Sequence, residues 1–129
     1  MTEGAMRAIV TDRAPQPVAA YSQAKRKGNI VQVAGQVGID PATGVVVPGG
    51  VAEQTRQVFA NIEAVLEAAG SSLADVVMMR AYLPDPAHFA EFNDAYNALV
   101  GEPYPARTTV YVGLPPGFLV EIDALAVLD

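Results

Sequence analysis

The sequence contains no cysteine and a single histidine, His88. Disulfide bonds, thiolate nucleophiles and zinc–thiolate sites are therefore excluded, and one histidine cannot supply a histidine-rich metal cluster. Lysine and arginine together number 8 against 14 acidic residues, which gives a net charge of −6. Such a charge disfavours electrostatic binding of nucleic acid or anionic lipid. These features predict a protein with no metal, no nucleic-acid partner and no membrane partner.

Long apolar runs are also absent. No stretch of about 18 apolar residues occurs, so no transmembrane helix is expected, and residues 1–10 lack the apolar core of a signal peptide. The chain should be soluble and cytoplasmic. Its 129 residues, 51% of them hydrophobic, are enough for one domain, residues 1–129, with a core of its own. The high apolar share also suggests that some surface is buried in an oligomer.

The spacing of apolar residues predicts alternating strands and helices. Strands are expected at residues 30–38, 76–83, 107–114 and 119–128, with a possible short strand at 7–12 and a returning strand at 45–47 that closes a hairpin with 30–38. One helix should cover residues 51–69 and end at Gly70. A second should begin at Asp85 as N-cap, with Pro86 in its first turn. The basic run Lys25–Lys27 is interpreted as a solvated turn.

The order of these elements predicts an α+β fold. The unit 76–114 reads as a βαβ crossover, so its two strands should be parallel, and the last strand should run antiparallel to them. Both helices would then cover one face of a mixed sheet. The other face carries apolar residues among polar ones, and burying it against copies of the chain predicts a closed homo-oligomer.

Arg107 and Glu121 are the candidate chemical residues. The planar guanidinium of arginine matches the two oxygens of a carboxylate, and Glu121 lies in an apolar strand where a carboxylate needs a partner or a chemical role. A structural ion pair between the two is an equally weighted alternative. If strands 107–114 and 119–128 formed a simple hairpin, Glu121 would lie about 13 Å along the strand from the residue facing Arg107. A neighbouring subunit could bring the two together.

Two other residues carry weaker signals. Gly35, inside the strand 30–38, suggests a β-bulge or a close backbone approach. Asn93 is expected on the inner face of the second helix, which otherwise carries Phe89, Phe92 and Tyr96. An amide among aromatic rings needs a partner, so Asn93 should bond to backbone or form the floor of a pocket.

Several motifs together resemble the RidA/YjgF family of small trimeric enamine and imine deaminases, over essentially the whole chain. They are residues 105–110 (PARTTV) followed by 120–122 (VEI), residues 33–36 (VAGQ), residues 20–24 (AYSQA) and residues 92–96 (FNDAY). The resemblance implies a chorismate-mutase-like α+β fold. It also implies a homotrimer with a central barrel and a ligand site in each cleft between subunits.

The resemblance further implies a role for each site residue. Arg107 would bind the substrate carboxylate, and Glu121 would hold or activate the hydrolytic water. Tyr21 would be the third catalytic residue and line the pocket, and four further residues would bind the substrate: Ala34, Gly35, Asn93 and Thr109. The implied reaction is hydrolysis of 2-imino acids, or of their 2-aminoacrylate tautomers, to 2-keto acids and ammonia. It requires no metal or cofactor, because an iminium carbon is already electrophilic.

The chain departs from the family pattern at certain positions, which puts its substrate preference in doubt. Ala34 stands where well-known members have serine, Thr109 where cysteine is frequent, and Tyr111 where a carboxylate occurs. A larger or more apolar imino acid is one possible substrate. A non-catalytic trimer that senses small carboxylates, and a specialised enamine deaminase of aminomuconate or aminoacrylate catabolism, are the alternative functions.

Overall fold

A computed structural model describes residues 6–129 of the protein. Residues 1–5, which begin the segment expected to lack the apolar core of a signal peptide, lie outside this range. The elements, in chain order, are β1 (Met6–Ile9), β2 (Ala24–Lys27), β3 (Ile30–Val37), β4 (Ile39–Asp40), β5 (Val45–Val46), α1 (Val51–Ala68), η1 (Leu73–Asp75), β6 (Val76–Leu83), η2 (Pro86–His88), α2 (Phe89–Leu99), β7 (Ala106–Tyr111) and β8 (Glu121–Val127).

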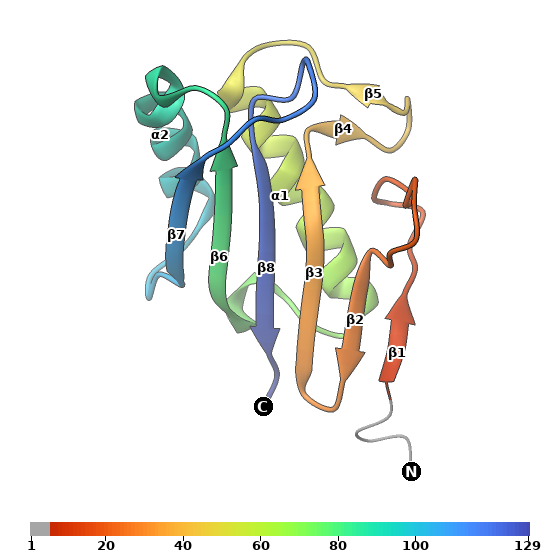
Figure 1. Cartoon of the computed structure of the whole chain (residues 1–129). Helices are drawn as coiled ribbons and strands as arrows, with labels where there is room; N and C mark the ends of the chain where they lie inside the picture. Colours follow the sequence, from red (N-terminus) through yellow and green to blue (C-terminus); the bar gives the residue numbers. More distant parts are fainter. Residues whose placement is uncertain (1–5) are drawn as a thin grey trace.

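Six strands form one mixed sheet in the order β1-β2-β3-β8-β6-β7, and both helices lie against the same face of it (Figure 1). β6 and β7 are parallel, as the βαβ unit predicts, and β8 runs antiparallel to β6. The α+β fold with both helices on one face is therefore confirmed. A hairpin between β7 and β8 is wrong, because β6 lies between them. The crossover through α2 carries β7 to the edge of the sheet and leaves β8 to enter its centre.

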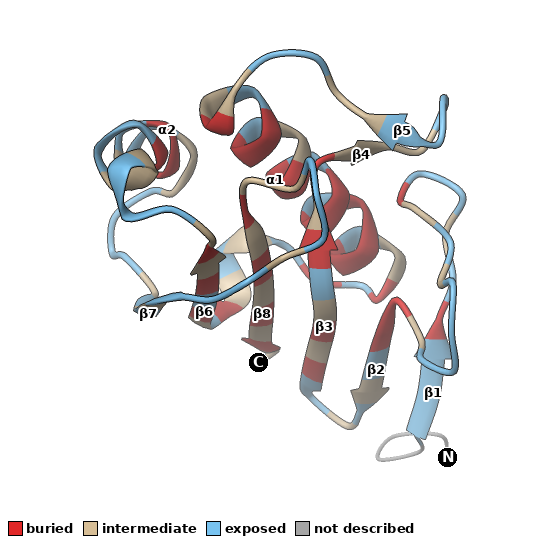
Figure 2. Ribbon diagram, turned by 45° about the horizontal axis from the view of Figure 1, so that its top comes forward, coloured by how far each residue is buried: buried red, intermediate tan, exposed pale blue. Residues whose placement is uncertain are grey.

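The core lies between the helices and the sheet. Figure 2 shows buried positions along α1 and, in alternation, along β3 and β8. Ile62 and Val65 of α1 are fully buried, as are Val33 and Ile122 of the sheet. This is the pattern expected when a helix with one apolar stripe covers strands whose side chains alternate between two faces. Gly70 ends α1 with a positive φ of 82°, as predicted.

The predicted hairpin between residues 30–38 and 45–47 is much smaller than expected. Only Ile39–Asp40 and Val45–Val46 pair there, as a separate two-stranded sheet, while β3 pairs with β2 and β8 instead. The turn residues 40–44 close this short ribbon as their Asp, Pro and Gly composition indicated.

The interpretation of Lys25–Lys27 as a turn is wrong, because these residues form most of β2 and pair with both β1 and β3. Arg26 faces the helix layer, where its guanidinium donates to the Ala69 carbonyl at 2.6 Å and to the Gly28 carbonyl at 2.9 Å. A cation here satisfies a free carbonyl at the C-terminus of α1. Arg26 thus belongs to a strand that the composition of residues 25–27 did not indicate.

The face of the sheet opposite the helices is open in the single chain. Ile30 and Val110 on this face are 50% and 38% exposed, and Met78 and Leu125 are half-buried. Exposed apolar surface on one face of a sheet is a feature of sites where another molecule packs, when the apolar residues are contiguous. The observation agrees with the predicted homo-oligomer, which remains a prediction.

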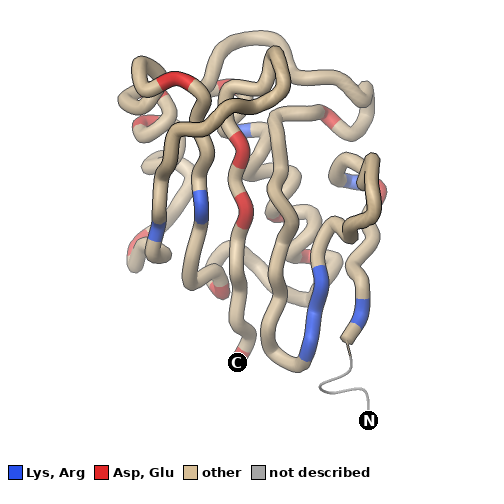
Figure 3. Tube along the Cα trace, viewed as in Figure 1, with Lys and Arg blue, Asp and Glu red and all other residues tan. Residues whose placement is uncertain are grey.

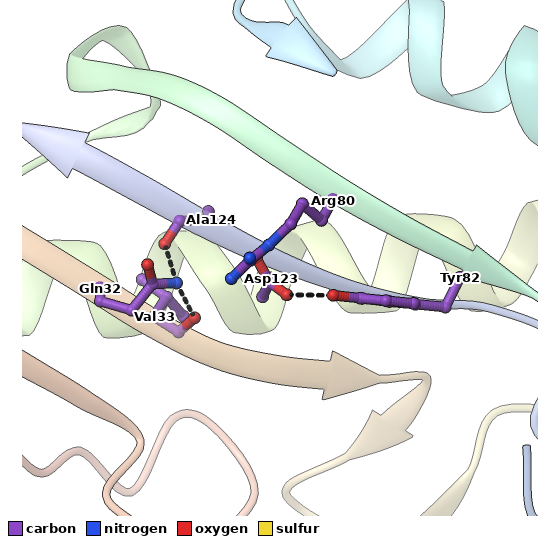
Figure 4. Close-up of polar contacts among 6 residues, drawn as sticks. All are labelled: Gln32, Val33, Arg80, Tyr82, Asp123 and Ala124. Atoms are coloured by element: carbon purple, nitrogen blue, oxygen red, sulfur yellow. Dashed lines mark hydrogen bonds and ion pairs between the residues drawn. The ribbon is translucent and has the colours of Figure 1, made fainter. Parts of the chain in front are cut away.

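Polar side chains at the centre of the open face satisfy one another (Figure 4). Arg80 Nε donates to Asp123 Oδ1 at 2.9 Å, and the Tyr82 hydroxyl donates to Asp123 Oδ2 at 2.8 Å. The hydrogen bond to Asp123 raises the pKa of Tyr82. Figure 3 shows that this region of β8 carries acidic residues, while basic residues are concentrated on β2. Asp123 is therefore occupied, and Glu121 is left as the carboxylate of β8 that is free for chemistry.

Within residues 6–129, no helix has the length and apolarity needed to cross a membrane. The same part of the chain contains no group of three or more His, Cys, Asp or Glu residues arranged to hold a metal ion.

Candidate active site

Gly35 and the Glu121 side chain are in close contact. The pairing of β3 with β8 shifts register between Val33 and Gln36, so Gly35 lies in a β-bulge. A Cβ atom on Gly35 would collide with the carboxylate of Glu121. The prediction of a bulge or a close approach at Gly35 is confirmed in both senses. The missing side chain leaves room for the Glu121 carboxylate to lie against the backbone of β3.

A cavity of about 420 Å³ opens beside this carboxylate. Four of the predicted site residues line it, namely Tyr21, Ala34, Gly35 and Glu121. The rest of its lining is largely apolar and includes Pro15, Val18, Val37, Ile39, Pro115 and Phe118. A mainly apolar hollow of this size with a few polar side chains, here Glu121, Tyr21 and three glutamines, is typical of a small-molecule site.

Buried amides hold the loops that form the cavity wall. Gln23 is 2% exposed; its amide nitrogen donates to the carbonyls of Thr11, Ala14 and Pro15 at 2.9–3.2 Å. From α1, Gln54 donates to the Gly117 carbonyl at 3.0 Å and accepts from the Leu119 amide at 2.9 Å.

Asn61 lies seven residues after Gln54 on α1. Its amide nitrogen donates to the carbonyls of Val37 and Ile39 at 3.2 Å and 3.0 Å. Sequence reasoning assigned no role to any of these three amides. Gln54 and Asn61 occur seven residues apart on the buried side of a helix, and buried polar side chains at helical spacing are the signal that could have found them.

Glu121 carries the electrostatic character of an acid–base group. Burial raises its pKa, and the nearby negative charge of Asp123 raises it further. No hydrogen bond from the described residues reaches its side chain, so its oxygens are free to accept from or donate to a ligand or water. A carboxyl group with a raised pKa beside a cavity is suited to proton transfer.

Arg107 lies elsewhere, under helix α2. Its guanidinium carbon is 4.6 Å from the centroid of the Tyr96 ring, 5.6 Å from that of Phe92 and 5.9 Å from that of Phe89. Within residues 6–129, no carboxylate forms an ion pair with it. Aromatic faces attract the cation but leave its five N–H donors unused. The arginine is thus held in place and still free to bind an anion.

Arg107 and Glu121 lie on opposite faces of the same sheet. Arg107 is in register with Met79, which is buried under the helices, while Glu121 is in register with Tyr82 on the open face. Met79 and Tyr82 point to opposite sides because they are separated by three positions of one strand. The alternative of a structural Arg107–Glu121 pair within one chain is therefore wrong. The two side chains are apart because they lie on opposite faces of the sheet and on strands that are not neighbours. The 13 Å hairpin offset that the sequence suggested is not the reason.

The other two predicted site residues fall on the Arg107 side. Thr109 follows Arg107 on the same face of β7, and its hydroxyl is buried without a partner among the described residues. Asn93 of α2 is half-buried. A hydrogen bond from its side chain to the backbone was one of the two roles expected for it, and no such bond is present within residues 6–129. One chain therefore gathers Tyr21, Ala34, Gly35 and Glu121 at one cavity and leaves Arg107, Thr109 and Asn93 apart from it.

These features define a small α+β protein with a ligand-sized cavity beside a carboxylate, and a separate arginine; within residues 6–129 neither group has an ion-pair partner. Comparison with known proteins gives the family. The model of the family described as Endoribonuclease L-PSP matches residues 11–128. The chain belongs to this family, which is the RidA/YjgF family.

The relatives include proteins named for an activity and proteins named only for the family. A RutC family protein of Pyrococcus horikoshii is 50% identical over 92% of this chain and 94% of its own length. A 2-iminobutanoate/2-iminopropanoate deaminase of Bos taurus is 42% identical over 92% of this chain and 88% of its own. Among solved structures, RidA from an Antarctic Psychrobacter is 46% identical, with a TM-score of 0.90 over 95% of this chain and 99% of that one.

The contact between Gly35 and Glu121 predicts a strong coupling between these two positions. Gly35→Ala should destabilise the protein by about 1–3 kcal/mol, because the new methyl group displaces a packed side chain. In a Glu121→Ala background the same substitution should cost much less, since the atoms it strikes are gone. Urea unfolding of the four proteins measures this double-mutant cycle. Equal costs in both backgrounds would show that the carboxylate does not lie against Gly35.

The raised pKa of Glu121 predicts a pH-dependent stability. When the folded-state pKa of an acid exceeds its unfolded value, the folded state binds more protons in the interval between them, and stability falls as pH rises through it. The wild type should therefore lose stability relative to Glu121→Gln above about pH 4, near the ordinary pKa of glutamate. Unfolding free energies measured across this range test the sign. Glu63→Gln on the exposed side of α1 serves as the control, and a widening advantage for the wild type would contradict the expectation.

Proposed function

We propose that this protein hydrolyses 2-imino acids and their enamine tautomers to 2-keto acids and ammonia, in sites formed between the subunits of a homotrimer. The observation that carries the proposal is the placement of an unpaired Arg107 and a free Glu121 on opposite faces of one sheet. A cleft between two copies is the arrangement in which one chain offers the carboxylate clamp and another the acid–base group. The named activity of the Bos taurus relative supports the reaction class.

Each step of the reaction uses groups that the chain supplies. The Arg107 guanidinium would bind the substrate carboxylate through two parallel hydrogen bonds. Glu121 would take a proton from a water as the water oxygen forms a bond to the carbon of the protonated imine, giving a neutral carbinolamine. Glu121 would return that proton to the nitrogen. As the C–N bond breaks and ammonia leaves, the carbinolamine hydroxyl would give its proton to the Glu121 carboxylate and become the carbonyl of the 2-keto acid. The net change consumes one water and releases one ammonia, and a carboxyl group with a raised pKa is suited to these transfers.

The cavity beside Glu121 supports a substrate with an apolar side chain. Its lining includes Val37, Ile39 and Phe118, and Ala34 adds no hydroxyl to the wall. Apolar contacts of this kind favour each additional methylene of a substrate by roughly 1 kcal/mol. We therefore expect imines of leucine- or methionine-like size to be accepted as well as 2-iminopropanoate.

An amino acid oxidase that generates 2-iminopropanoate in the cuvette provides the test. The wild type should hasten imine loss. Arg107→Ala should raise KM about 10–100-fold, the value of hydrogen bonds to a charged group, and Glu121→Gln should lower kcat about 10²–10⁴-fold, the contribution of general acid–base catalysis. Arg56→Ala, an exposed arginine of α1, is the matched control and should behave as wild type.

The deaminase proposal fails if the wild type does not hasten imine loss and Arg107→Ala behaves identically. A thermal shift on adding pyruvate or 2-ketobutyrate, without turnover, would instead favour a trimer that only binds small carboxylates. Light scattering after size exclusion measures the assembly, and a monomer would remove the proposed intersubunit cleft.

A further inference from the structure

The guanidinium of Arg107 rests on an aromatic platform provided by α2. Tyr96 lies nearest, at 4.6 Å from ring centroid to guanidinium carbon, and Phe92 and Phe89 stand further away at 5.6 Å and 5.9 Å. No ion pair from residues 6–129 reaches this guanidinium, and no side-chain hydrogen bond is present there either. The ring faces are therefore what sets its orientation.

The Tyr96 ring is itself rigid. It is 4% exposed, and two other rings hold it. Phe59 meets it edge to face at 5.6 Å and 78°, and Phe92 lies tilted at 5.7 Å and 48°. Edge-to-face packing fixes ring orientation as well as position.

The hydroxyl of Tyr96 plays no visible part in this arrangement. Its oxygen is buried and has no hydrogen-bond partner among the described residues. Burial raises the pKa of this phenol, so it stays neutral, while the charge of Arg107 acts in the opposite direction. The contact between Tyr96 and Arg107 is therefore made by the ring face and not by a hydrogen bond to the hydroxyl.

From this geometry we propose that Tyr96 is a positioning residue, whose ring face holds the Arg107 guanidinium so that its N–H donors point at the substrate carboxylate. The inference rests on the proposed function only in assigning a carboxylate to Arg107. A pre-oriented arginine loses less conformational freedom on binding, so the effect should appear in substrate affinity and not in the chemical step. Tyr96 acts through Arg107 and does not itself touch the substrate.

Pairing a conservative and a disruptive variant tests the proposal. Tyr96→Phe keeps the ring and should change the Kd for pyruvate by less than about twofold. Tyr96→Leu removes the nearest ring of the platform and should weaken pyruvate binding, and raise KM, about tenfold with kcat nearly unchanged, in line with a lost cation–π contact. Leu66→Ala, a fully buried core substitution on α1, controls for lost stability and should leave the Kd unchanged at temperatures where it is folded.

A spectroscopic measurement separates this proposal from the deaminase proposal. The ring currents of the platform should shift the Arg107 Nε–H resonance, and this shift should be retained in Tyr96→Phe and become smaller in Tyr96→Leu, whether or not the protein turns over imines. If the protein does not hydrolyse imines but these shifts and the pyruvate affinities are as expected, the deaminase proposal alone is contradicted. An unchanged Arg107 resonance and unchanged pyruvate Kd in Tyr96→Leu would overturn the platform, and so would a Tyr96→Phe variant as impaired as Tyr96→Leu.

Discussion

A half-buried arginine needs an anionic partner, and within residues 6–129 Arg107 has none. Its partner cannot be Glu121 of the same chain, because strand pairing fixes the two side chains on opposite faces of one sheet. A single chain therefore presents Arg107 and Glu121, the two residues of the proposed site, on separate faces. The aromatic rings of α2 hold the cation in place and supply no charge, so the guanidinium stays available to an incoming carboxylate.

The other half depends on one missing side chain. Gly35 in the bulge of β3 gives the Glu121 carboxylate a place against the backbone, partly out of water, and this burial raises its pKa. Helix α1 also supports the cavity beside Glu121. Its buried Gln54 donates to the loop that precedes β8, and Asn61 donates to the last carbonyl of β3. The polar groups of the core thus hold the cavity wall, while the apolar stripe of the same helix holds the fold together.

Local patterns predicted most of the elements. The apolar stripe and Gly70 defined α1, β-branched runs defined β3 and β6, and Asp85 with Pro86 marked the start of the second helical segment. The sequence did not reveal that Lys25–Lys27 forms a strand, because that depends on pairing with β1 and β3, which lie elsewhere in the chain. The neighbour of β8 was missed for the same reason, since strand order is a non-local property.

The candidate site was predictable to a similar extent. Tyr21, Ala34, Gly35 and Glu121 meet at one cavity, and the Gly35 bulge followed from a glycine inside a strand. The roles of Arg107, Asn93 and Thr109 stay predictions, because the cleft that would unite them with Glu121 requires a second chain. Tyr96 was assigned only to a helix face and Gln54 received no assignment, since their contacts with a guanidinium and with a loop appear only when distant segments are packed together.

The central claim is that the arginine and the glutamate of one site come from different subunits. The most direct measurement co-expresses Arg107→Ala and Glu121→Gln chains with different tags and isolates the mixed trimers that carry both tags. Each variant alone should be nearly inactive in the imine assay at substrate concentrations well below the wild-type KM, where a raised KM and a lowered kcat both reduce the rate. Mixed trimers should regain activity in roughly one third of their sites, because one interface in a cyclic trimer then has both residues intact. Mixed trimers as inactive as their parents would contradict the account.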